Sequence, residues 1–347
     1  MGFIETVFEK LRRHPKRIVF PDGELPRVIR AAEIFYQRQL GVPILLGRRD
    51  VIKQIASEEN IRLDRVGIID PTNSSELPIF CQRLERIERY RKVELKDSRE
   101  IMSKPNYFGA MMIQYSMADA MVGGASSTGG AILRPVLLLV KPLPHADVIS
   151  SCTIVELQNT AFGDGGVLFF ADTGVVPDPT MQQLATIGVQ TGLLARQVFG
   201  HRPRVAMLSF STKGSTRTAA TQKIAGAVEL ARHIAEKVNA DMSIDGEMQA
   251  DAALVPALAE IKMADSPVGG KANVLVFPDL NSGNIAMKLV QILGGANTYG
   301  QIFTGLSRPV ADIPRGASPD NIAIVAALVG LQAIEYRSLY PADNHSE

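Results

Sequence analysis

One local plan recurs along the chain and limits the folds that it can adopt: a short apolar run, a loop of small residues, and then an amphipathic helical stretch. Parallel strands need a long crossover connection, usually a helix, so this alternation predicts an α/β protein with parallel-type sheets flanked by helices. Near the start of the chain, strands are predicted at 17–21 and 42–46. Four later strands, each followed by a polar loop that contains glycine, are predicted at 118–122, 167–172, 204–209 and 272–277. Ligands collect at the carboxyl ends of parallel strands, so these loops are expected to line a shared cleft.

The length and the net charge of the chain further limit the class of protein that it can be. A chain of 347 residues is long enough for two domains. Its 37 basic and 36 acidic side chains give a net charge of +1, which lacks the footprint of a nucleic-acid or membrane-surface binder. Residues 1–16 lack the apolar core of a signal peptide. Apolar runs such as 136–140 are far shorter than the roughly 20 residues that span a bilayer. The sequence therefore predicts a cytoplasmic protein with no nucleic-acid or membrane partner.

Metal and nucleotide sites are not indicated. The two cysteines, Cys81 and Cys152, cannot form a thiolate metal site alone, and the five histidines include no HxxxH or HExxH pair. Neither a Walker A sequence nor a GxGxxG fingerprint follows any predicted strand. We therefore expect no metal ion.

The loop 123–130 is the first candidate binding segment. It holds four glycines and three hydroxyl side chains, Ser127 and Thr128 among them, and Arg134 follows one turn later. Glycine allows backbone N–H groups to converge on an anion, and an arginine matches a phosphate or a developing oxyanion. A tight turn from strand to helix with a surface arginine fits the same spacing, so the residues alone leave both interpretations open.

Two segments in the middle of the chain are also polar. Ser211 and Lys213 lie among hydroxyl residues in the loop after strand 204–209, where they are predicted to bind substrate. Asp245, Glu247 and Asp251 form an acidic cluster. With no histidine nearby, a capping or turn role is favoured over a metal site.

The segment 308–321 leads into a strongly apolar helix. Ser318 suits the N-cap, Pro319 the first helical position and Asp320 the positive end of the helix dipole. Arg315, with Gly316 beside it, lies just ahead of that helix. A cation is disfavoured at a helix N-terminus unless an anion joins it, so Arg315 is predicted to contact a ligand.

Over essentially the whole chain, these segments resemble the phosphate acetyltransferase family, which interconverts acetyl-CoA and phosphate with acetyl phosphate and CoA. The most specific matches are VAMLSFSTKGS at 205–215 and DGEMQADAA at 245–253. The resemblance implies a homodimer of two α/β domains, one from 1–145 plus 295–347 and one from 146–294, with the active-site cleft between them. It also implies CoA as a substrate and no permanently bound cofactor.

The resemblance further implies a mechanism. A carboxylate helps to deprotonate the CoA thiol, the thiolate attacks the acetyl carbonyl of acetyl phosphate in a ternary complex, and arginines bind the phosphate. Arg134 and Arg315 match active-site arginines of the family. Arg89 matches a third, with Arg86 and Arg91 as rivals. Ser127 and Thr128 match hydroxyl residues that line the same pocket, and Gly316 belongs to the matched segment.

Two departures fall at the implied catalytic centre. The family has serine before the arginine and an acidic residue six positions after it, whereas this chain has Pro314 and Asn321. An asparagine cannot accept a proton at neutral pH. Asp320 is one residue earlier, which on a helix turns it about 100° away, and Asp312 is another nearby candidate.

Three outcomes stay open at this point: an enzyme with a displaced base, a slower enzyme, or a non-catalytic module that senses acetyl-CoA. Propanoyl or butanoyl transfer is a further alternative, because pocket volume cannot be read from the sequence.

Overall fold

The computed structural model describes residues 2–87, 97–126, 130–144 and 146–339. It divides into two compact units, which we call unit 1 (Met1–Pro142 with Leu306–Glu347) and unit 2 (Leu143–Gly305). The sequence predicts a domain boundary near 295, whereas the second unit extends to Gly305 because the strand 297–304 pairs with one of its strands. That the two units are independent domains stays a prediction.

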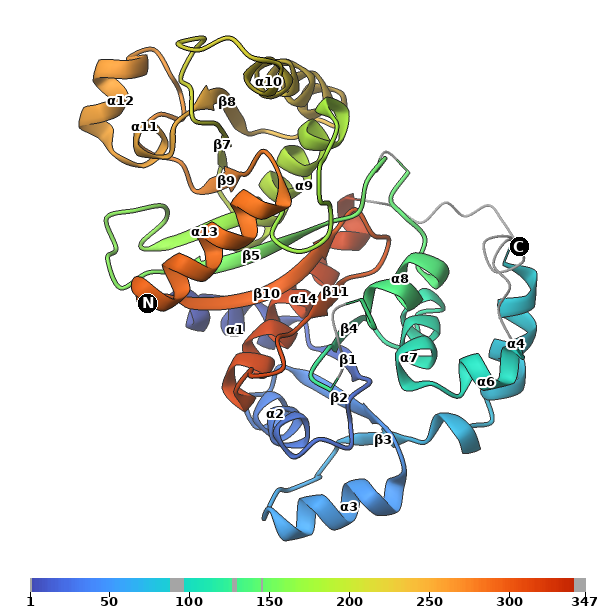
Figure 1. The fold of residues 1–347 in the computed structure, drawn as a ribbon. Helices are drawn as coiled ribbons and strands as arrows, with labels where there is room; N and C mark the ends of the chain where they lie inside the picture. Colours follow the sequence, from blue (N-terminus) through green and yellow to red (C-terminus); the bar gives the residue numbers. More distant parts are fainter. Residues whose placement is uncertain (1, 88–96, 127–129, 145, 340–347) are drawn as a thin grey trace. The chain divides into compact units, whose positions relative to one another are not determined.

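The described residues of unit 1 form five parallel strands (Figure 1). In spatial order they are β3 (Gly67–Ile69), β2 (Gly41–Leu46), β1 (Lys16–Phe20), β4 (Ala120–Gly123) and β11 (Val310–Asp312). The helical elements of this unit are α1 (Phe3–Arg13), α2 (Pro26–Gln37), α3 (Arg49–Glu58), η1 (Pro71–Asn73), α4 (Leu77–Arg86), α6 (Ser98–Met102), α7 (Pro105–Gln114), α8 (Leu133–Leu139) and α14 (Pro319–Leu339). Ile18, Val19 and Phe20 of β1 are fully buried, and α14 packs on α1, α2 and β4.

Unit 2 has a mixed sheet. Its strands in spatial order are β10 (Asn297–Thr304), β5 (Ser150–Glu156), β6 (Val167–Ala171), β9 (Val274–Val276), β7 (Arg204–Leu208) and β8 (Ser243–Met248). Its helices are α9 (Met181–Phe199), α10 (Ala219–Lys237), α11 (Ala250–Leu254), α12 (Pro256–Met263) and α13 (Leu280–Leu293). The α/β class predicted from the sequence is confirmed. Strand β5 differs from the parallel pattern: it runs antiparallel to both neighbours, because the short segment 157–166 leaves no room for a crossover helix to β6.

Capping residues fix where the long helices begin. Thr180 and Thr218 each accept a hydrogen bond from the backbone N–H three residues on, which starts α9 and α10 with capping boxes. At α14 the Ser318 hydroxyl accepts the Asn321 N–H at 3.2 Å, as predicted for an N-cap. No helix in the described part of the chain is long and apolar enough to cross a membrane.

Candidate active site

The carboxyl ends of β1, β4 and β11 bring three chain segments of unit 1 together. Strand β4 pairs with β1 on one side and with β11 on the other. In the register of β4 and β11, Asp312 lies opposite Gly123, and the Ile313 N–H donates to the Gly123 carbonyl at 2.8 Å. The loop after β4 and the segment that carries Arg315 therefore leave the sheet side by side.

Asp22, in the loop after β1, anchors the loop after β4. Its carboxylate accepts the N–H groups of Gly124 at 2.9 Å, Ala125 at 3.0 Å and Ser126 at 3.3 Å, and also the Ser126 hydroxyl. Asp22 is 8% exposed, and Arg27 of α2 donates to the Ala125 carbonyl. The backbone donors that the sequence suggested for an external anion thus bind a carboxylate of the protein itself.

A second carboxyl group, that of Asp312, lies against the same loop. A Cβ atom at Gly124 would fall 1.8 Å from Asp312 Oδ1, and the φ of Gly124 is +105°, so glycine is required here. The structure gives the Asp312 side chain no hydrogen bond or ion pair to any described residue. Burial and the charge of Asp22 raise its pKa to about 6. Asp312 can therefore exchange a proton close to neutral pH.

The predicted arginines lie on the two segments that leave this edge. Arg134 is exposed in α8, and Arg315 is exposed between β11 and α14. Gly316 and Asp320 are also exposed, and Asn321 is half-buried in the first turn of α14. The other predicted contacts of this region, Arg89, Ser127 and Thr128, lie outside the described residues, as does the rival Arg91.

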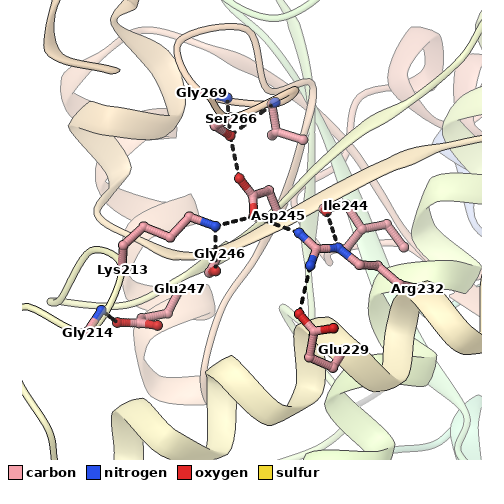
Figure 2. A network of polar contacts seen from close by, with 11 residues as sticks. Lys213, Gly214, Glu229, Arg232, Ile244, Asp245, Gly246, Glu247, Ser266 and Gly269 are labelled. Atoms are coloured by element: carbon pink, nitrogen blue, oxygen red, sulfur yellow. Dashed lines mark hydrogen bonds and ion pairs between the residues drawn. The ribbon is translucent and has the colours of Figure 1, made fainter. Parts of the chain in front are cut away.

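Lys213 of unit 2 makes an ion pair with a buried acid (Figure 2). Its Nζ donates to Asp245 Oδ1 and, at 3.3 Å, to the Gly246 carbonyl. The same carboxylate, with 2% of its side chain exposed, accepts from Arg232 at 2.8 Å and from the Ser266 hydroxyl. Burial alone raises the pKa of Asp245, but the hydrogen bonds from Lys213 and Ser266 outweigh it and hold the pKa below the usual range.

Ser211 is held in a similar way. Its hydroxyl donates to the buried carboxylate of Glu247 at 3.1 Å, and the Gly214 N–H donates to the same oxygen at 2.7 Å. Asp245 and Glu247 both lie in β8, so the turn or capping role predicted for them is wrong. Each carboxylate is stabilised in the strand by donors from a distant loop. That Ser211 and Lys213 contact substrate stays a prediction.

The loop after β6 is also held by a buried carboxylate. Asp172, buried at the end of β6, accepts the N–H groups of Gly174, Val175 and Val176 and the Ser151 hydroxyl. None of these anchoring roles is predicted from the sequence. Their only sequence signal is an acidic residue at or beside the end of an apolar strand. The described residues contain no group of three or more histidine, cysteine or acidic side chains that could hold a metal ion.

Known proteins place the chain in a family. The family model described as "Phosphate acetyl/butaryl transferase" matches residues 2–329. The chain belongs to this family. A phosphate acetyltransferase from Thermoanaerobacterium thermosaccharolyticum is 40% identical over 333 residues, which is 96% of this chain and 100% of that protein. One from Acetivibrio thermocellus is 38% identical and covers 96% and 98%.

Solved structures agree with this assignment. A phosphotransacetylase from Streptococcus pyogenes superposes with a TM-score of 0.88 at 35% identity, covering 96% of this chain and 100% of that one. A branched-chain phosphotransacylase from Enterococcus faecalis shares the fold at 17% identity, with a TM-score of 0.64 over 92% and 99% of the two chains. Members of this family are acyltransferases, and so is this protein.

Proposed function

We propose that the protein is a phosphate acetyltransferase, which interconverts acetyl-CoA and phosphate with acetyl phosphate and CoA. The observation that carries this proposal is the 40% identity, over 96% of this chain and 100% of the other, to a relative with that name. In this proposal CoA is a substrate that enters and leaves, not a resident cofactor.

The chemistry needs cationic groups at the phosphate and a group that accepts the thiol proton. The thiolate attacks the acetyl carbon of acetyl phosphate, a C–S bond forms, and the C–O bond to phosphate breaks. Negative charge develops on the carbonyl oxygen and on the leaving phosphate, where arginine side chains stabilise it. Arg134 and Arg315, both exposed on segments that leave one sheet edge, are the proposed phosphate ligands.

The direct test measures phosphate-dependent release of CoA from acetyl-CoA with a thiol reagent. We expect saturable turnover with both substrates and a preference for acetyl-CoA over butanoyl-CoA. CoA binding without turnover would contradict the proposal and would identify a sensing module instead. A preference for butanoyl-CoA would keep the acyltransferase and change its substrate.

We also propose that the protein is a homodimer. Helix α13 exposes four large apolar side chains, each 51–80% accessible, at Ile285, Leu289, Ile292 and Leu293. Their spacing of four, three and one residues places them along one side of the helix. A stripe of this kind on a folded unit is typical of a protein–protein contact, and a second copy of the chain is the proposed partner.

Sedimentation velocity tests this assembly. Ile292→Glu should convert a dimer into a monomer, because it places a charge within the apolar stripe. Val238→Glu, at an exposed apolar residue at the end of α10, is the control and should stay dimeric. A wild-type monomer would contradict the proposal.

A cytoplasmic location is proposed as well. Cys81 and Cys152 are both free thiols, as in proteins of a reducing compartment.

A further inference from the structure

We propose that Asp312 accepts the proton of the CoA thiol. This inference rests on the proposed acetyl transfer and names the residue that performs its proton-transfer step.

Asp312 lies where the proposed phosphate ligands leave the sheet. It is the last residue of β11, three positions before Arg315, and its carboxyl group packs against Gly124. The loop that begins at Gly124 leads to Arg134. Asp312 is therefore close along the chain to Arg315 and packs against the start of the segment that carries Arg134.

The other carboxyl groups of this edge are less suited to the step. Asp22 already accepts four donors from residues 124–126, so its oxygens are engaged in holding the loop. Asp320 is exposed to solvent, where water competes for the proton. Asp312 is half-buried and, among the described residues, has no donor bound to its oxygens.

Burial and the neighbouring carboxyl group of Asp22 give Asp312 a pKa suited to accepting the thiol proton. The pKa of Asp312, raised to about 6 by burial and by Asp22, lies close to the working pH of a neutral-pH enzyme, where a general base is most effective. Two neighbouring carboxyl groups with different environments commonly take different roles. Charged groups on the surrounding elements are Asp22 after β1, Arg27 on α2, Arg134 on α8, Arg315 before α14 and Asp320 in its first turn.

The thiol proton passes to a carboxylate oxygen of Asp312, and the sulfur keeps the electron pair. The sulfur forms the C–S bond with the acetyl carbon, and phosphate departs with the electrons of the C–O bond. Asp312 then releases its proton to water. In the opposite direction the protonated Asp312 returns a proton to the departing thiolate.

The test is the pH profile of acetyl transfer from acetyl phosphate to CoA. Wild type should reach a plateau above an apparent pKa near 6. Asp312→Asn, which has the same shape and fits against Gly124, should lower kcat by roughly 10²- to 10⁴-fold near pH 7 with little change in the KM for acetyl phosphate. Its rate should keep rising toward the thiol pKa of about 8.5, so its deficit shrinks in alkali. A residue with only a structural role would not change the shape of the profile.

Asp64→Asn, at an exposed aspartate of unit 1, is the control for loss of one negative charge and should match wild type. An Asp312→Asn variant with wild-type rates, or with a uniform loss at every pH, would overturn the inference alone. If Asp320→Asn, and not Asp312→Asn, removed the rise of the rate around pH 6, Asp320 would be the base. A wild type without turnover would overturn the proposed function, and this inference with it.

Discussion

The loop after β4 in unit 1 and the loop after β7 in unit 2 look alike in sequence, but their carboxyl groups differ. Both loops follow a parallel strand, and both are tied to a carboxylate that is buried nearby. In unit 2, both Asp245 and Glu247 are hydrogen-bonded to donors. In unit 1, Asp22 is equally engaged, whereas Asp312 has no donor among the described residues.

The comparison shows that residue type does not distinguish a structural acid from a reactive one. A buried carboxylate with several donors is stabilised in its charged form, so it holds a loop and resists protonation. A half-buried carboxyl group that lies next to another negative charge and accepts no hydrogen bond takes up a proton more easily. The number of donors around each acid therefore assigns anchoring to Asp22, Asp245 and Glu247, and proton transfer to Asp312.

The largest expected effect is a loss of catalytic activity when Arg315, at the carboxyl edge of the unit 1 sheet, is replaced. Arg315→Ala should lower kcat/KM by roughly 10²- to 10³-fold, or about 3–4 kcal/mol of transition-state stabilisation, because a positioned donor to developing charge is lost. Initial rates with varied phosphate measure it. Arg65→Ala, at an exposed arginine of the same unit, is the control. An Arg315→Ala enzyme within threefold of wild type would remove Arg315 from the proposed site.

The two loops also show which features of the fold and of the candidate site can be predicted from the sequence and which cannot. The six predicted strands follow from short apolar runs, and the N-cap at Ser318 follows from its side chain, so these predictions are confirmed. Asp22 lies 102 residues before Gly124, and Lys213 lies 32 residues before Asp245. Such pairs exist only once the sheet has assembled. For this reason the sequence leaves open whether the loop donors bind a ligand, and it predicts a capping or turn role for the β8 acids.

A smaller effect is expected on the stability of unit 2. Asp245→Asn leaves Lys213 and Arg232 without their shared anion, and breaking a buried pair is costly. The two cations are 43% and 40% exposed, so solvent screening reduces the loss to about 2–3 kcal/mol at pH 7. Urea denaturation measures this loss.

The pH dependence of that loss follows from the lowered pKa of Asp245. Its contribution to stability is present above the ordinary aspartate pKa, and it disappears as the pH falls through the lower folded-state value. Wild type and Asp245→Asn should therefore converge in acid. The control Asp265→Asn, at an exposed aspartate next to Ser266, should unfold like wild type at every pH. Equal stability of Asp245→Asn and wild type at pH 7 would contradict the anchoring role.

The smallest expected effect has the opposite sign. The pKa of Asp312 in the folded protein, about 6, is above the ordinary value of 3.8, so its ionised form is less favourable in the folded state than in the unfolded chain. The resulting loss of stability is absent below about pH 4, grows as the pH rises to about 6, and is complete above that.

Asp312→Asn removes a charge that is unfavourable in the folded protein, and should therefore stabilise it at pH 7.5. The full difference in pKa corresponds to about 3 kcal/mol, and partial exposure reduces the expected gain to about 1–2 kcal/mol. Thermal and urea unfolding at pH 7.5 and about pH 3.5 should show a gain at the first pH and almost none at the second. A variant that is less stable than wild type at pH 7.5 would mean that Asp312 anchors its loop as Asp22 does, and the distinction between the two acids would fail. A variant that is more stable and less active would show that the protein keeps a destabilising carboxylate at this position for its chemistry.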